Sequence, residues 1–137
     1  MADTLPAVFF AQARQRAGDV ALVEFDGRAR TLTWGDWAGA VRACAASLLE
    51  AGHGPGERVA VFAGNGVLWS VVDVAAQAIG MVSVGIFPTS APVQVAQVLA
   101  DAGVSAAFAD TPERAALLVA ARAHVQSLRT VVVDAES

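Results

Sequence analysis

Residues 64–90 have the sequence GNGVLWSVVDVAAQAIGMVSVGIFPTS, and the order of signals within this stretch decides the fold. Residues 64–66 are typical of a turn, and residues 67–79 have the apolar content of a packed helix. After a second turn, the uncharged residues 83–87 have the length and composition of a buried strand, which Pro88 ends. The stretch therefore predicts a turn, a helix, a turn and a buried strand in succession.

The same alternation continues through the rest of the chain. Uncharged strands separated by helices indicate a parallel sheet that is covered on both faces. We therefore predict an α/β fold with a mostly parallel sheet flanked by helices. The expected strands are 59–62, 83–87, 106–109 and 130–133, and the expected helices are 67–79, 92–102 and 112–125.

An N-terminal helix and a β-hairpin are expected to precede this sheet. Thr4 has the side chain of a helix N-cap, and Gly18 follows the expected end of that helix. Residues 21–25 and 29–33 flank residues 26–28 (Asp-Gly-Arg), a sequence typical of a hairpin turn.

A long helix and a glycine-rich connector lead from the hairpin to the sheet. The helix is expected to begin at Thr33 or Asp36 and to run to about Glu50. Residues 52–56 (Gly-His-Gly-Pro-Gly) end it. They are not the dinucleotide-binding fingerprint, because that motif follows a strand and opens a helix.

The length of the chain indicates one domain, and its composition is unusually apolar. Hydrophobic residues make up 55% of the 137 residues and charged residues only 16%. Either part of this apolar surface is meant for a partner, or the many alanines account for it. The net charge of −4 and the scattered arginines argue against binding to nucleic acid. We expect residues 1–57 and 58–137 to be two parts of the same, incomplete domain.

A transmembrane or exported protein is not indicated. Residues 74–100 carry no charged side chain, but Pro88, Pro92 and several glutamines interrupt them. The N-terminus is acidic and lacks the layout of a signal peptide. A cytoplasmic protein is the expectation.

Few residues have the setting of a reactive group. Residues 64–66 form either an anion cradle or, as we favour, a tight turn with Asn65 near a helix N-cap. His53 and His124 lack recognisable carboxylate partners and are expected at the surface. Cys44 is the only cysteine and is expected to be a buried structural thiol. The three tryptophans are expected to pack between layers; they are Trp34, Trp37 and Trp69.

Four segments, in chain order, resemble the N-terminal part of the adenylate-forming (AMP-binding) enzymes, and the long-chain acyl-CoA synthetases above all. They cover nearly the whole chain. Residues 31–37 (TLTWGDW) resemble "LTY-x-EL", and residues 49–61 (LEAGHGPGERVAV) resemble "L-x-x-x-G-x-x-x-GDRVAI". The third segment, with Asn65, Trp69 and Asp73, resembles "N-x-x-EW-x-x-x-D". Residues 79–89 (IGMVSVGIFPT) resemble "x-G-x-V-x-VGIYPT".

The match has substitutions within it. Trp34 and Asp36 stand where the family has Tyr and Glu, Leu68 replaces an acidic residue, and Phe87 replaces Tyr. The "VGI-aromatic-PT" pattern is similar to that of enzymes acting on fatty or bulky acyl groups.

The resemblance implies a reaction but not a complete site. The family activates a carboxylic acid with ATP and Mg²⁺ as an acyl-adenylate and then usually transfers it to coenzyme A. The family's phosphate loop with its lysine, and its later catalytic motifs, have no counterpart in these residues. The resemblance therefore implies a scaffold segment with no catalytic residue and no cofactor bound by the segment alone.

Two regions match family positions near coenzyme A. They are the loop after the "VGI" strand, with Phe87, Pro88 and Thr89, and a basic residue after the next strand, Arg114. An arginine suits a phosphate, but a solvated arginine in the first turn of a helix is the other interpretation.

Two hypotheses remain open on the sequence alone. The chain is either the N-terminal segment of an acyl-CoA synthetase or a stand-alone, non-catalytic α/β binding or assembly module built on that scaffold. In both cases the last strand carries three consecutive valines without a covering helix. We therefore expect the chain to associate with the rest of its enzyme, or with itself.

Overall fold

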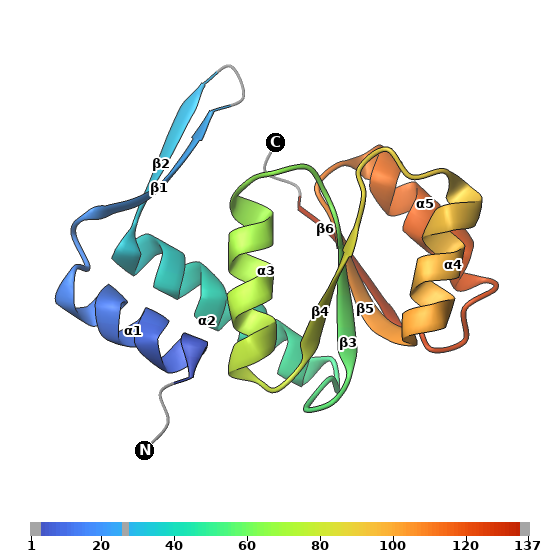
Figure 1. The fold of residues 1–137 in the computed structure, drawn as a ribbon, viewed down its shortest axis with the longest axis horizontal. Coiled ribbons are helices and arrows are strands. Elements are labelled where there is room, and N and C mark those ends of the chain that lie inside the picture. The colour runs from blue at the N-terminus through green and yellow to red at the C-terminus, as the bar shows by residue number, and fades with distance from the viewer. Residues whose placement is uncertain (1–3, 26–27, 135–137) are drawn as a thin grey trace.

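The computed structural model describes residues 4–25 and 28–134 and confirms the α/β fold (Figure 1). The predicted turn residues Asp26 and Gly27 lie outside the described residues. In the part of the chain that is described, the elements are α1 (Leu5–Gln15), β1 (Val20–Phe25), β2 (Ala29–Thr33), α2 (Trp34–Glu50), β3 (Arg58–Phe62), α3 (Val67–Ala78), β4 (Val82–Ile86), α4 (Pro92–Ala102), β5 (Val104–Ala109), α5 (Pro112–Arg122) and β6 (Thr130–Val133).

Side-chain caps fix the starts of the first two helices. The Thr4 hydroxyl accepts a hydrogen bond from the Ala7 amide, as the sequence predicts. At α2 both proposed starting residues take part. The Thr33 hydroxyl accepts from the Asp36 amide at 3.0 Å, and the Asp36 carboxylate accepts from the Thr33 amide at 3.0 Å. This capping box places the N-cap at Thr33.

Helices α1 and α2 pack through an aromatic cluster. The ring of Phe9 lies 4.6 Å from that of Trp37 and 6.1 Å from that of Trp34, centroid to centroid. The antiparallel β1–β2 hairpin joins these helices and projects away from them (Figure 1). A two-stranded hairpin is marginally stable alone, so its contacts with the rest of the molecule matter.

The four remaining strands form one parallel sheet in the order β4-β3-β5-β6. Helices α2 and α3 lie on one face, and α4 and α5 lie on the other (Figure 1). Alternate residues of β3 serve both layers: Val59 and Val61 pack toward α2 and α3, whereas Ala60 and Phe62 pack toward α4 and α5. This double burial explains why the strands lack charge.

The strand order creates a switch point between β3 and β5. The chain passes from β3 through α3 outward to β4, and then returns through α4 past β3 to β5. The loops that leave the carboxyl ends of β3 and β5 therefore diverge onto opposite faces of the sheet. In open α/β sheets such a point forms a crevice where ligands bind.

Strand β6 lies at the edge of the sheet and is only partly covered. Val131 packs against the core on the α4 and α5 side. Val132 and Val133 are 36% and 42% exposed. The predicted helix 112–125 ends early, at Arg122, because the chain turns there to bury Val125 and Leu128 before it enters β6.

Candidate functional site

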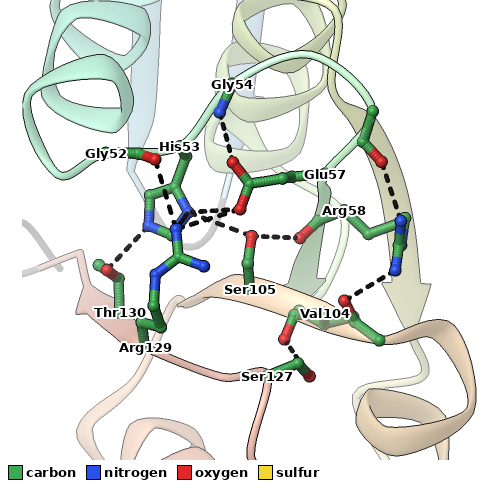
Figure 2. A network of polar contacts seen from close by, with 12 residues as sticks. Gly52, His53, Gly54, Glu57, Arg58, Val104, Ser105, Ser127, Arg129 and Thr130 are labelled. Carbon is green, nitrogen blue, oxygen red and sulfur yellow. Dashed lines mark hydrogen bonds and ion pairs between the residues drawn. The ribbon is translucent and has the colours of Figure 1, made fainter.

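The amino end of the sheet holds a buried polar cluster around His53 (Figure 2). His53 follows α2, and its Nδ1 lies 3.1 Å from the Ser105 hydroxyl at the start of β5. Its Nε2 lies 2.9 Å from the Thr130 hydroxyl at the start of β6. The prediction of a surface histidine is wrong, since His53 is only 3% exposed. The connector 52–56 folds beneath the sheet, where three polar groups surround the ring.

Two charged side chains border this cluster. Arg129 Nη2 lies 3.1 Å from both Glu57 Oε1 and His53 Nδ1, and 3.4 Å from the Gly52 carbonyl. The other Glu57 carboxylate oxygen accepts from the Gly54 amide at 2.7 Å. Burial lowers the pKa of His53, and the Arg129 guanidinium lowers it further, while Glu57 opposes both. The imidazole is therefore neutral at pH 7.

A serine, a histidine and a glutamate in contact suggest a hydrolytic triad, but the geometry excludes one. Ser105 is 4% exposed, so no substrate reaches its hydroxyl. That hydroxyl also donates to the Arg58 carbonyl at 3.2 Å. The cluster holds the loop after α2 to the starts of β5 and β6. Its sequence signal is the pair of polar residues, Ser105 and Thr130, at the starts of otherwise apolar strands.

The carboxyl end of the sheet is built differently, around the loop that joins β3 to α3. The N-cap of α3 is Gly66, next to Asn65, and no side chain within the loop caps the helix. Instead the carboxylate of Glu24, from the hairpin, accepts from the Val67 amide at 2.7 Å. A Cβ at Gly66 would lie 2.6 Å from that carboxylate oxygen, so a larger residue there would displace the carboxylate.

A second carboxylate binds the same loop from β5. Asp110 accepts from the Gly64 amide at 3.0 Å and from Arg114 Nη1 at 2.7 Å. The amides at the two ends of the loop, those of Gly64 and Val67, are thus bonded to acidic side chains. The loop is a turn bound by two carboxylates, whose negative charge disfavours an anion such as the phosphates of ATP there.

Arg114 belongs to this end of the sheet and is neither free nor fully solvated. Its backbone amide donates to the Thr111 hydroxyl, which caps α5. Its guanidinium pairs with Asp110 and lies 5.9 Å from the centre of the Phe62 ring. The side chain is therefore held over the end of β3 by a carboxylate and an aromatic ring.

A hollow of about 550 Å³ opens between this loop and the hairpin. Its lining combines apolar hairpin residues with the turn and with acidic groups from the ends of β5 and β6. This is the crevice expected at the switch point. Its lining includes Leu22, Glu24, Phe25, Arg30, Asn65, Asp110 and Asp134.

Phe87, Pro88 and Thr89 follow β4 at the same end of the sheet. Phe87 is 81% exposed and borders two smaller hollows, of about 230 and 460 Å³. Pro88 lines the first with Trp69, and Thr89 lines the second. Arg114 lines neither of them. The four residues singled out from the sequence therefore share one end of the sheet but not one hollow.

The other reactive groups have structural surroundings. Cys44 lies partly buried between the aromatic cluster and the α2–α3 core, and burial raises the pKa of its thiol to about 11. His124 is exposed, as predicted. Over residues 4–25 and 28–134, no group of three or more His, Cys, Asp or Glu side chains is placed to hold a metal ion. No helix in that same part of the chain is long and apolar enough to cross a bilayer.

The chain forms an α/β scaffold with a crevice at its switch point, and comparisons with known proteins identify its family. The chain matches the family described as AMP-binding enzyme over residues 9–137. It is 34% identical, over 107 residues, to the long-chain-fatty-acid–CoA ligase FadD15 of Mycobacterium bovis, a match that covers 78% of this chain and 18% of the relative. The chain belongs to the AMP-binding enzyme family.

Solved structures agree with the fold. The inhibitor-bound N-terminal domain of FACL13 from Mycobacterium tuberculosis superposes with a TM-score of 0.87 at 22% identity, covering 97% of this chain and 34% of that one. The anthranilate CoA ligase AuaEII in complex with anthranoyl-AMP gives a TM-score of 0.85 at 20% identity, covering 94% and 24%. The chain thus spans about a fifth of the curated relative and a quarter to a third of these structures.

Proposed function

We propose that this chain is the N-terminal scaffold segment of an acid–CoA ligase. The complete enzyme would activate a fatty or bulky carboxylic acid with ATP and Mg²⁺ as the acyl-adenylate and transfer the acyl group to coenzyme A. The family match over residues 9–137, together with 34% identity to a long-chain-fatty-acid–CoA ligase, carries this proposal.

Within that enzyme the segment would supply structure rather than adenylation chemistry. The Gly64 and Val67 amides, at the ends of the loop after β3, are bonded to Asp110 and Glu24, and these carboxylates oppose a triphosphate there. All nine basic residues are arginines, and no lysine is present to stabilise the charge on the phosphates as the adenylate forms. We therefore assign these residues no part in holding ATP or Mg²⁺ and no catalytic step.

One region of the scaffold would face coenzyme A. The resemblance implies that Phe87, Pro88, Thr89 and Arg114 lie near that cofactor. The exposure of Phe87 beside two hollows supports a contact for the first three. Arg114 would reach a phosphate only by leaving, or sharing, its bond with Asp110.

The rest of the enzyme would be the partner of this segment. A hollow of about 290 Å³ lies beside β6, lined by residues of α2 and α3 as well as Val132 and Val133. Burying the side chains of those valines would stabilise the assembly by about 25 cal/mol for each Å² of apolar surface removed from water. We propose that the remainder of the ligase covers this surface, and that the isolated chain self-associates. Light scattering during size exclusion tests this, and a sharp monomer at high concentration would contradict it.

The proposal of a scaffold is tested by supplying the missing part. The isolated chain, mixed with ATP, Mg²⁺, coenzyme A and a panel of fatty and aryl acids, is expected to form neither adenylate nor thioester. A chimera in which this segment replaces the matching part of the mycobacterial FadD15 ligase is expected to keep thioester formation. Adenylate made by the isolated chain, or a folded but inactive chimera, would overturn the proposal.

A further inference from the structure

The cluster around His53 joins three segments that are far apart in the sequence. The imidazole comes from the loop after α2, and its two nitrogens contact hydroxyls 52 and 77 residues away, at the starts of β5 and β6 (Figure 2). The Arg129 amide, next to Thr130, donates to the Ser105 carbonyl at 2.9 Å. The start of edge strand β6 is thus bound to β5 by its backbone and to the loop by the histidine.

Counting hydrogens assigns the form of the imidazole. Arg129 Nη2 has two hydrogens, and its two shortest acceptors are Glu57 Oε1 and His53 Nδ1, each at 3.1 Å. Because a guanidinium can only donate, Nδ1 carries a lone pair, while the Ser105 hydroxyl donates to the Arg58 carbonyl. Nε2–H then donates to the Thr130 hydroxyl oxygen. In this neutral tautomer the Arg129 guanidinium faces an acceptor.

Protonating Nδ1 breaks this arrangement. The Arg129 guanidinium, just before the start of β6, loses its acceptor and faces an N–H at 3.1 Å, and a cation forms on a side chain with no exposed surface. The charged groups that face the ring are Arg129, at 3.1 Å, and Glu57, at 3.8 Å. Arg58, at the start of β3, directs its guanidinium away to carbonyls at the end of α4. Glu57 is already bonded to Arg129 and Gly54, so it compensates the new charge only in part.

We propose that His53 is a pH-sensitive latch that holds edge strand β6 in the sheet while neutral and releases its start when protonated. The strand it holds carries the exposed Val132 and Val133 and is followed by Asp134, which lines the crevice at the opposite end of the sheet. Release of the latch therefore changes the surface beside α2 and α3, and also one wall of the switch-point crevice.

The direction of the pH effect follows from linkage. The folded environment lowers the pKa of His53 below that of an exposed histidine. The stabilisation is complete above the pKa of the exposed form and is lost as the pH falls toward the folded value. Acidification below neutral pH enters this window, and it favours states in which the start of β6 has opened.

The chain offers a matched control, because its two histidines have opposite surroundings. In the variant His124→Gln, His53 is the only imidazole, so its NMR titration is free of overlap. We expect its midpoint to lie below that of the same histidine in the urea-unfolded chain, and its ¹⁵N shifts to be those of the Nε2–H tautomer. Arg129→Met removes the cation and the donor at Nδ1 and is expected to raise the His53 midpoint. A His53 midpoint at or above that of the unfolded chain would overturn the proposal.

Hydrogen exchange then tests whether the release is local to β6. The Arg129 and Asp134 amides, bonded to β5 carbonyls, report on β6, and the Val82 amide, bonded to the Glu57 carbonyl, reports on the opposite edge. The protection factors of the Arg129 and Asp134 amides, relative to that of the Val82 amide, are expected to fall with acidification by at most about tenfold per pH unit. The same experiment on His53→Gln is expected to show no such fall. An equal loss at Val82, or an unchanged fall in His53→Gln, would contradict the latch.

Discussion

The two ends of the parallel sheet use polar side chains in opposite ways. At the amino end, His53, Ser105 and Thr130 bond to one another in a closed and buried cluster. At the carboxyl end, Asp110 and Glu24 bond to backbone amides of one loop and border an open hollow. The first end holds strands together, and the second end leaves an open hollow at the surface.

The difference indicates at which end of the scaffold a ligand has room to bind. Polar groups that satisfy one another completely have no capacity left for a ligand. Loops at the carboxyl ends of parallel strands diverge at the switch point and leave space between them. The residues that resemble the coenzyme A region, Phe87 to Thr89 and Arg114, all lie at that second end. Substitutions at the two ends should therefore have different consequences.

The largest effect is expected at the closed end, from His53→Leu. A leucine fills much of the space but leaves the Thr130 hydroxyl without its partner and removes the bridge between β5 and β6. A buried unsatisfied polar group costs about 1–3 kcal/mol, so we expect a loss of about 2–3 kcal/mol in the free energy of unfolding. Urea denaturation followed by tryptophan fluorescence measures it.

The control for this substitution is His124→Leu at the exposed histidine. Exposed substitutions of this kind stay within about 0.5 kcal/mol of the parent. If the two histidine variants were equally stable, the comparison between a closed and an open end would fail.

A smaller effect is expected at the open end, from Asp110→Ala. This variant frees the Gly64 amide and the Arg114 guanidinium, but both lie near solvent, so we expect a loss of about 1–2 kcal/mol. Asp110→Asn keeps an acceptor for the amide and loses only the ion pair with Arg114, so it should cost less. Denaturation of both variants at low and high salt separates the two contributions. An Asn variant as unstable as the Ala variant would show that the ion pair dominates.

Local signals predicted most of the fold, and distant contacts account for what they missed. The bounds of α4 and β6 match the prediction, because Pro92 begins that helix, Gly103 follows it in a left-handed conformation, and three valines define the strand. The burial of His53 depends on partners 52 and 77 residues away. The cap on α3 comes from Glu24, 43 residues earlier. Such contacts exist only after the hairpin and the sheet have assembled, so no sequence window contains them.

Glu24 provides a test of how the hairpin is attached. Its carboxylate caps α3, where a negative charge also favours the helix dipole, so Glu24→Ala is expected to lower the free energy of unfolding by about 1 kcal/mol. Glu24→Gln retains an oxygen acceptor and should lose less than half of that. Exchange of the Val67 amide is the local readout, and unchanged protection in Glu24→Ala would show that the cap contributes nothing.

The smallest effect on stability is expected from Phe87→Ala, and this variant separates folding from function. Phe87 is 81% exposed, so its removal should change the free energy of unfolding by less than about 0.5 kcal/mol. If its ring contacts coenzyme A in the complete ligase, the same substitution in the chimera should raise the KM for coenzyme A. The adenylation half-reaction, followed by ATP–pyrophosphate exchange without coenzyme A, should stay unchanged. Val93→Ala, at a residue 78% exposed on α4, is the matched control and should alter neither quantity. An equal loss in both half-reactions would indicate that Phe87 positions the scaffold, because a residue that only contacts the cofactor leaves the first step intact.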